Sequence, residues 1–357
     1  MRPLVASIHL AALRHNYQRA RQAAPGSRVF AVVKANAYGH GVSEVVTALA
    51  GAEGFAVACL EEALQVRALQ PEARILLLEG CFSADEYGLA ADQSLDIVLQ
   101  RPDQLELLHQ ARLVRPLNIW LKLDSGMHRL GFAPDALRQV SARLQGMAQV
   151  ASLNLLSHFA CADEPGHPLT TRQLACVAGL QDLPFAGRSL ANSAAVLGLP
   201  EAHLDWVRPG IMLYGAAPFA GQPAVVSGLQ PVMALTAQLI AVREVAAGES
   251  IGYGASWIAR QPSRIGTVSC GYADGYPRSA PAGTPVLVRG QRVPLAGRVS
   301  MDMLMVDLTP LPEARPGDAV ELWGGDLPVD EVARACGTIG YELLTRVTAR
   351  VPRDYRD

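Results

Sequence analysis

Short apolar runs alternate with segments of helical periodicity up to about residue 215. Strands that alternate with helices predict βαβ units and a parallel sheet. Eight such strands predict a closed TIM-type (β/α)8 barrel rather than an open sheet, and no G-x-G-x-x-G motif follows the first strand. We expect strands at 29–34, 54–60, 74–79, 95–99, 117–123, 152–159, 188–192 and 204–214, and helices at 42–52, 60–70, 83–92, 102–112, 134–146 and 170–182.

The pattern changes after a connection rich in proline and glycine, between Pro218 and Pro231. Downstream, short apolar runs are separated by Gly/Pro turns, which is typical of β structure. The fold class is therefore α/β + β, with a barrel domain over 1–229 and a mainly β domain over 230–357. In the second domain we expect strands at 232–245, 265–270, 284–288, 292–296, 303–308 and 319–323, a helix at 328–336 and a loop at 337–341.

Composition narrows the class of protein. The chain has 357 residues, half of them apolar, with a net charge of −2, so it can build two cores and shows no basic tract for nucleic acid or anionic membrane. The start, residues 1–9, lacks a signal-peptide core, and no apolar run is long enough for a membrane span. Six scattered cysteines without a C-x-x-C pair predict reduced thiols in a cytoplasmic protein, and the histidines show no metal-ligand spacing.

Polar residues follow several of the predicted barrel strands, at the end where barrel active sites form. A lysine that ends a buried strand either reaches solvent or serves chemistry, because desolvation lowers the amine's pKa and favours Schiff-base formation. Any single residue of the set could be structural, but together they predict a cationic pocket for an anionic ligand. The set comprises Lys34, Lys122, Asp124, Arg129, His158, Asn192, Ser193 and Arg208.

These residues lie in motifs that resemble those of the alanine racemases. The matches run in order through nearly the whole chain, and the ordered set is specific although each motif alone is weak. They are Ala31–Gly41 around Lys34, Lys122-Leu-Asp-Ser-Gly-Met-His-Arg129, Ser157-His158-Phe159, Asn192-Ser193, Val207–Gly215, Gly252-Tyr253-Gly254, Gly271–Tyr276, Arg298–Asp302 and Ile339–Glu342.

The resemblance implies an isomerase that interconverts L- and D-alanine and supplies D-alanine, a peptidoglycan precursor. It implies pyridoxal 5'-phosphate (PLP) as cofactor, held by Lys34 as an internal aldimine that alanine converts to an external aldimine. Lys34 would be one acid/base, and Tyr253 from the partner subunit of a homodimer the other. From the sequence alone, Tyr253 could equally be an aromatic residue flanking a glycine turn.

The resemblance also assigns the remaining site residues. Arg208 would face the pyridine nitrogen, although it could instead close the barrel in an ion pair, and His158 would contact the ring. Arg129 and the Met301 amide would bind the substrate carboxylate, and Lys122 is expected to be carbamylated. Ser193 could also cap the short helix at 194–198. The phosphate would be held by Tyr38, Ser193, Gly210, Ile211 and Tyr341, and the substrate corridor lined by Tyr272, Tyr341, Asp163, Arg278 and Arg298.

Three alternatives stay open beside this reading. A broader-specificity amino-acid racemase would use the same mechanism, but those carry an export signal and a roomier mouth. A non-catalytic PLP-carrier protein would match the barrel alone, which residues 230–357 and Tyr253 disfavour. A Schiff-base aldolase without PLP would need only the lysine.

Overall fold

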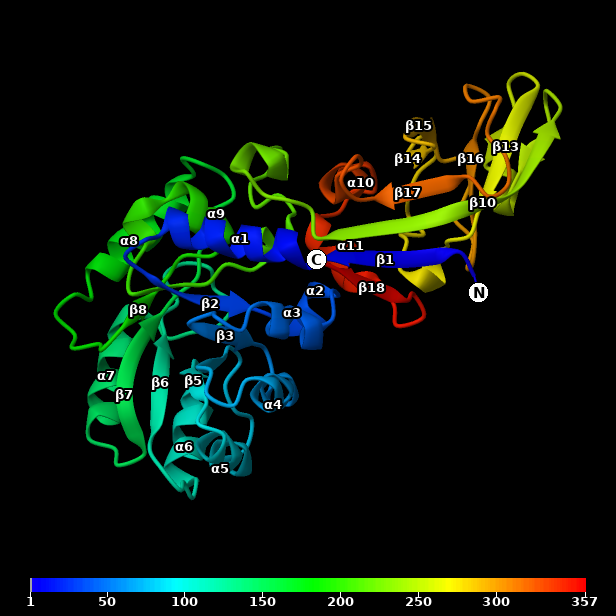
Figure 1. The fold of residues 1–357 in the computed structure, drawn as a ribbon. Helices are drawn as coiled ribbons and strands as arrows, with labels where there is room; N and C mark the ends of the chain where they lie inside the picture. Colours follow the sequence, from blue (N-terminus) through cyan, green and yellow to red (C-terminus); the bar gives the residue numbers. More distant parts are fainter. Residues whose placement is uncertain (1) are drawn as a thin grey trace.

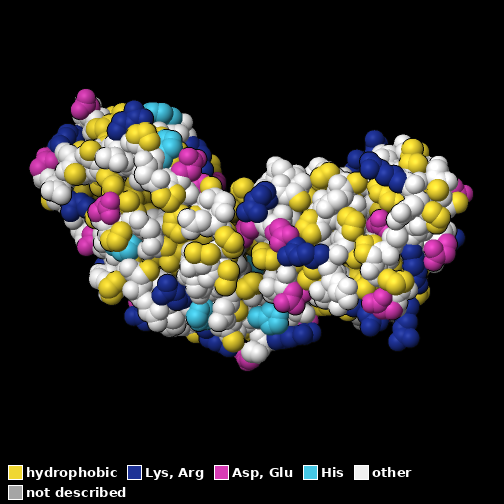
Figure 2. All heavy atoms as spheres, turned by 90° about the horizontal axis from the view of Figure 1, so that it is seen from above, with side chains coloured by type: hydrophobic (Ala, Val, Ile, Leu, Met, Phe, Trp, Pro, Cys, Tyr) yellow, Lys and Arg dark blue, Asp and Glu magenta, His cyan; other side chains and the backbone are white. Residues whose placement is uncertain are grey.

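The computed structural model describes residues 2–357 and contains two lobes joined side by side (Figures 1 and 2). One lobe is a closed barrel of eight parallel strands with helices outside it, and the other is built around an antiparallel sheet. The predicted (β/α)8 barrel followed by a mainly β domain is therefore confirmed. On the face shown in Figure 2, acidic and basic side chains are interspersed.

The barrel strands pair in chain order, and β9 closes the barrel on β2. The strands are β2 (Arg28–Val32), β3 (Gly54–Val57), β4 (Ile75–Leu77), β5 (Asp96–Leu99), β6 (Leu117–Lys122), β7 (Val150–Leu156), β8 (Arg188–Ser189) and β9 (Trp206–Val207). The helices of this lobe are α1 (Leu10–Ala23), α2 (Lys34–Tyr38), α3 (Val42–Ala48), α4 (Leu60–Leu69), α5 (Ala84–Asp92), α6 (Pro102–Gln110), α7 (Pro134–Gln145), α8 (Pro168–Ala178) and α9 (Ser193–Gly198).

The last two barrel strands are shorter than predicted. The apolar run expected as a strand at 204–214 is a strand only at β9, because Pro209 and Gly210 interrupt it and a 3₁₀ turn, η2 (Ile211–Tyr214), follows. The expected strand at 188–192 likewise ends after β8, and Asn192 is the N-cap of α9 instead.

The second lobe has a six-strand path in the order β15-β14-β17-β10-β1-β18, with β13 paired to β10 and β16 paired to β13. Its strands are β10 (Met233–Val245), β13 (Ser263–Val268), β14 (Pro285–Val288), β15 (Gln291–Pro294), β16 (Leu304–Asp307), β17 (Ala319–Trp323) and β18 (Arg353–Arg356), beside the hairpin β11 (Ser250–Ile251) and β12 (Trp257–Ile258). Two helices, α10 (Val329–Ala335) and α11 (Gly340–Arg346), complete it. The predicted loop at 337–341 is confirmed for residues 337–339, whereas residues 340 and 341 form the start of α11.

The first strand of the chain, β1 (Leu4–His9), belongs to the sheet of the second lobe. It pairs antiparallel with β10 and parallel with β18, so both chain ends enter one sheet (Figure 1). The predicted barrel domain over 1–229 therefore includes a strand that the fold uses elsewhere. The boundary at 229/230 stays our proposal for the rest of the chain.

A fully packed core closes the N-terminal end of the barrel. Phe30 stacks on Trp206 at 4.0 Å between ring centroids and meets Trp120 edge-on at 5.7 Å. Beside these rings the buried Asp96 carboxylate accepts from Trp120 Nε1 at 2.8 Å and Arg74 Nε at 2.7 Å. This end is therefore closed to ligands, and a site must lie at the opposite mouth.

A metal-binding cluster and a membrane-spanning helix are both absent from the part of the chain that the structure describes. Within residues 2–357, no cluster of His, Cys, Asp and Glu side chains is arranged to hold a metal ion. No helix in the same residues has both the length and the apolar character needed to cross a membrane.

The Asp96 network gives the first prediction. Asp96→Ala should lower the free energy of unfolding by about 3 kcal/mol, because Arg74 and the Trp120 N–H lose their buried acceptor. Denaturant titration followed by circular dichroism, at matched protein concentration, measures this change. Asp103→Ala removes an exposed ion pair with Arg101 and should change stability by less than about 0.5 kcal/mol. Equal effects of the two substitutions would contradict the role given to Asp96.

Candidate active site

The C-terminal mouth of the barrel holds a cavity of ≈ 650 Å³. Its lining includes the cationic and imidazole side chains that the sequence placed at strand ends, so the structure brings these predicted residues together. The lining residues from that set are Lys34, Lys122, Arg129, His158, Asn192, Ser193 and Arg208, with Tyr38, Gly210, Ile211 and Tyr341 beside them.

Lys34 begins α2, which is a left-handed turn. The four residues after it, 35–38, have φ values of 52–53°, a conformation that costs about 1–2 kcal/mol per residue for L-amino acids. Glu62 of α4 opposes this cost: its carboxylate accepts from the Ala35 N–H at 2.7 Å and from the Ala58 N–H at 2.8 Å. One acidic side chain thus ties the Lys34 turn to the end of β3.

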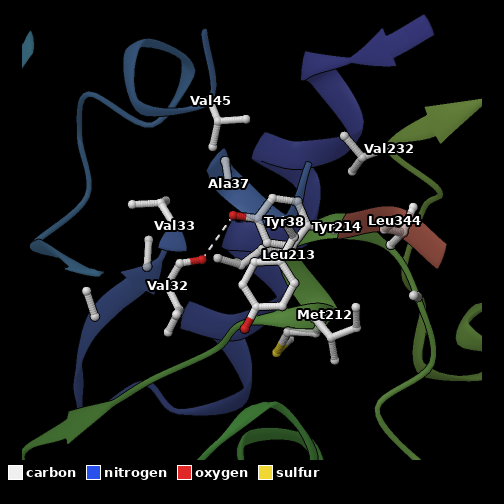
Figure 3. Packing of buried hydrophobic residues seen from close by; sticks show 14 of the residues in the cluster. Val32, Val33, Ala37, Tyr38, Val45, Met212, Leu213, Tyr214, Val232 and Leu344 are labelled. Carbon is white, nitrogen blue, oxygen red and sulfur yellow. Dashed lines mark hydrogen bonds between the residues drawn. The ribbon is translucent and has the colours of Figure 1, made fainter. Parts of the chain in front are cut away.

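Aromatic rings support this turn from behind (Figure 3). Tyr38 stacks on Tyr214 at 4.7 Å, and Tyr214 donates through its hydroxyl to the Val32 carbonyl at 2.9 Å. His40, fully buried, packs on the Tyr214 ring, and burial lowers the pKa of its imidazole to about 4. A neutral, tightly packed wall therefore backs the strained segment that carries Lys34.

Neutral polar groups gather on one side of the cavity. The Ser193 hydroxyl accepts from the N–H groups of Gly210 at 2.8 Å and Met212 at 3.3 Å. Ile211 is buried, and within residues 2–357 its amide donates to no other group. A side chain at Gly210 would meet the Tyr38 hydroxyl at 2.5 Å, so it would displace the Tyr38 ring. Serine and tyrosine hydroxyls beside an amide that donates to no other group form a neutral anion-binding nest.

The helix cap at this nest differs from the predicted one. Asn192 is the N-cap of α9, and its side chain accepts from the Ala195 N–H at 3.1 Å. Ser193 is the first helical residue instead. Its hydroxyl is therefore committed to the Gly210 loop rather than to capping.

Arg208 is a buried cation held only by neutral acceptors. It donates to the Ser189 hydroxyl at 2.5 Å and to the Ser157 carbonyl at 2.6 Å. Burial lowers its pKa to about 10, so it remains charged at neutral pH. The alternative of a barrel-closing ion pair is wrong, because within residues 2–357 its hydrogen bonds go to hydroxyl, carbonyl and imidazole groups.

His158 is held neutral by its surroundings. Its Nδ1 lies 3.4 Å from Arg208 Nη2. Burial first, and then the charges of Arg208 and Arg129, lower the pKa of the imidazole to about 3. A neutral ring can stack on or hydrogen bond to a ligand without adding charge to the cationic pocket.

Lys122 lies among like charges. Its Nζ donates to Gln100 Oε1 at 3.2 Å, and burial followed by repulsion from Arg129 and Arg208 lowers its pKa to about 8. At pH 8, therefore, a large share of this amine is unprotonated and nucleophilic. Gln100 was not anticipated, since a glutamine at the end of β5 carries no charge to mark it.

Tyr341 of α11 is the one predicted site residue of the second lobe that lines this cavity, whereas Tyr253, Met301, Tyr272, Arg278 and Arg298, and Asp163 of the barrel lobe, are not part of the lining within residues 2–357. Tyr253 is 69% exposed and Met301 53% exposed, and the Arg298 guanidinium lies 3.2 Å from the position of a side chain at Gly254. Arg278 and Asp163 are also exposed, Tyr272 is half-buried, and Asp163 influences Tyr341 electrostatically. These residues face outward from one subunit.

One signal in the sequence could have identified the cavity sooner. The chain contains 31 basic residues but only two lysines, Lys34 and Lys122, and both line the same cavity. Elsewhere arginine carries the positive charge. The rarity of lysine in this chain, with both lysines in one cavity, therefore singles out that cavity.

Comparison with known proteins finds the same family in both lobes of the chain. The family model described as alanine racemase, N-terminal domain, matches residues 8–218, and that for the C-terminal domain matches residues 232–355. An alanine racemase of Stutzerimonas stutzeri is 68% identical over 99% of both chains.

Solved structures agree with this match. The crystal structure of the biosynthetic alanine racemase from Pseudomonas aeruginosa is 68% identical, covers 100% of both chains and has a TM-score of 0.99. An alanine racemase from Bartonella henselae with covalently bound pyridoxal phosphate is 34% identical over 100% of both chains, with a TM-score of 0.91.

Because the chain has only two lysines, the pKa of the Lys122 amine can be followed by chemical modification. In CO₂-free buffer, acetylation of Lys122 by acetic anhydride should reach half its maximal rate near pH 8. The reagent attacks the unprotonated amine, so a lowered pKa moves the rate profile to lower pH. Peptide mass spectrometry reads the modification site by site, and the denatured chain is the control, with its midpoint near the ordinary value of 10.5. A midpoint above pH 10 in the folded protein would contradict the charge environment described.

Proposed function

Because this chain belongs to the alanine racemase family, a family of isomerases that use PLP, we propose that Lys34 and Tyr253 are its two proton-transferring residues. The proposal depends on one observation: Lys34 lines the cationic cavity, whereas Tyr253 stands exposed on the other lobe and can act only on another subunit's cavity. When bound, PLP supplies an electron sink that makes the α-proton of an attached amino acid removable. The two residues would then move protons on opposite faces of that carbon.

The cavity has the groups that PLP requires. Its phosphate would be held by the neutral nest of Tyr38, Ser193, Tyr341 and the amides of Gly210 and Ile211. Burial raises the pKa of both Tyr38 and Tyr341, so their hydroxyls stay protonated and can donate to a phosphate. Lys34 would attach the cofactor covalently through its Nζ.

Arg208 and His158 would set the electronic character of the site. Arg208, buried and cationic, would donate to the pyridine nitrogen without releasing a proton. By keeping its own proton, Arg208 would leave that nitrogen unprotonated, which would weaken the electron sink and disfavour transamination. His158, neutral beside Arg208, would pack against the ring.

Arg129 and Lys122 would act together on the substrate side. Arg129 would bind the substrate carboxylate and the cofactor's phenolic oxygen, with the Met301 amide of the partner as a second donor. We propose that Lys122 is carbamylated: its amine attacks CO₂ and releases one proton. The resulting anion would neutralise and fix Arg129, which otherwise faces a like charge.

The assembly we propose is a homodimer with shared sites. Its support is the exposure of Tyr253, Met301, Arg278 and Arg298 on one lobe and the open cavity on the other. Tyr272 and Tyr341, with Asp163 and the two arginines, would then narrow the corridor, which favours alanine over larger amino acids. The six unbonded cysteines support a cytoplasmic location.

Isotope exchange tests the two-base assignment. Tyr253→Phe should lower racemisation by at least about 100-fold. In ²H₂O the variant should still exchange the α-proton of one alanine enantiomer, because Lys34 remains on one face. ¹H NMR follows the exchange, and Tyr17→Phe, which loses only its two hydrogen bonds with Glu53, should behave as wild type. Equal loss of exchange for both enantiomers would refute separate bases.

The carbamate can be observed in the native state. With ¹³C-labelled bicarbonate, ¹³C NMR should show one carbamate signal in the wild-type enzyme. The signal should vanish in Lys122→Arg, whose guanidinium does not lose its proton. A fully active enzyme whose Lys122 carries a free amine would overturn this assignment.

A further inference from the structure

A buried carboxylate lies directly behind two turns that carry proposed site residues. Asp274 closes the 3₁₀ turn η5 (Tyr272–Asp274), and its side chain is fully buried. Burying a carboxylate is costly unless charged or N–H groups surround it. Here the Gly271 N–H donates to it at 2.8 Å, and Arg2 and Arg350 complete its surroundings.

The two arginines come from opposite ends of the chain. Arg2 donates to both carboxylate oxygens of Asp274, at 2.6 and 2.8 Å, and Arg350 Nε lies 2.9 Å from Oδ1. Such bidentate arginine–carboxylate pairing fixes orientation as well as distance. Arg2, which lies just before β1, therefore fixes the position of the η5 turn.

The same guanidinium groups also reach the next turn, at Asp302. Arg350 Nη2 donates to its carboxylate at 2.7 Å, and Arg2 Nη2 donates to its carbonyl. Asp302 directly follows Met301. Arg2 thus bridges the turn that carries Tyr272 and the turn that carries Met301.

Backbone contacts make these two turns a single body. The Tyr272 N–H donates to the Ser300 carbonyl at 3.0 Å, and the Ala273 N–H to the Met301 carbonyl at 2.9 Å. A side chain at Gly271 would lie 2.4 Å from the carbonyl oxygens of Ser300 and Met301. Any shift of one turn must therefore move the other.

The outer surface of this body is the part that would face a partner. Met301 is exposed, and within residues 2–357 its amide donates to no acceptor. An amide that must meet a substrate carboxylate in a different subunit needs its position set by its own subunit. The Arg2–Asp274 pair lies directly behind it.

We propose that Arg2, acting through Asp274, is a positioning residue for the active site of the partner subunit. It touches neither substrate nor cofactor; it holds the Met301 amide and Tyr272 in place. The inference rests on the proposed sharing of sites between subunits. It assigns an active-site role to a residue at the start of the chain, far in sequence from every catalytic motif.

Arg2→Ala is the informative variant, because Arg350 still pairs with Asp274 and Arg2 is 32% exposed, so the fold should persist. KM for both alanine enantiomers should rise about 10-fold, with kcat within about threefold of wild type and unchanged PLP content. Arg2→Lys should recover part of the affinity, because it restores the charge without the fork. The matched control is Arg14→Ala, which removes a long-range arginine pair with Asp357 and should leave KM unchanged. A KM for Arg2→Ala equal to that of the control would overturn the proposal.

Hybrid dimers separate this inference from the proposed function. Hybrids can be isolated with two different affinity tags. A hybrid of an Arg2→Ala chain with a Lys34→Ala chain has one competent site, whose β domain keeps Arg2, so its KM should be that of wild type. A hybrid of wild type with the Arg2→Ala/Lys34→Ala chain should keep the raised KM. The reverse pattern would refute shared sites while leaving a positioning role for Arg2 within one chain.

Discussion

A cluster of positive charge that forms no direct ion pair within residues 2–357 is the constraint on which this structure depends. Lys34, Lys122, Arg129 and Arg208 line one cavity, and the side chains of Lys122 and Arg208 donate to neutral acceptors. Glu79, also in the lining, offsets only part of the charge around Lys122. Burial, and then repulsion among these charges, lowers the pKa of Lys122 and of His158. An anionic ligand and a carbamate would relieve that repulsion, so the cavity's charge is complementary to the cofactor and substrate it is proposed to bind.

The barrel can accommodate the cationic cluster at its C-terminal mouth because its N-terminal end is closed and densely packed. Aromatic rings and the Asp96 network fill the N-terminal end, so strain can be concentrated at the mouth. There the left-handed turn after Lys34 is held by Glu62 and by the stacked Tyr38 and Tyr214. The turn that Lys34 begins is therefore held from both sides, and these contacts sustain its strained backbone.

The barrel and the grouping of the site residues could be predicted from the sequence. The alternation of strands and helices predicts the barrel, and the barrel brings strand ends such as Lys34 and His158 to one mouth. Features that depend on contacts between distant parts of the chain were not predicted. Strand β1 joins the second sheet through pairing with β10 and β18, and α11 forms despite its flanking glycines. The left-handed turn has no glycine among residues 35–38 to announce it.

The central claim is that each active site is built from two chains, and subunit mixing tests it most directly. Lys34→Ala and Tyr253→Phe homodimers should each be nearly inactive. After the two are unfolded together in equal amounts and refolded, half of the dimers should be hybrids with one intact site. The account predicts recovery of about one quarter of wild-type activity. If the mixture stays as inactive as its parents while hybrids demonstrably form, Tyr253 does not act across the interface.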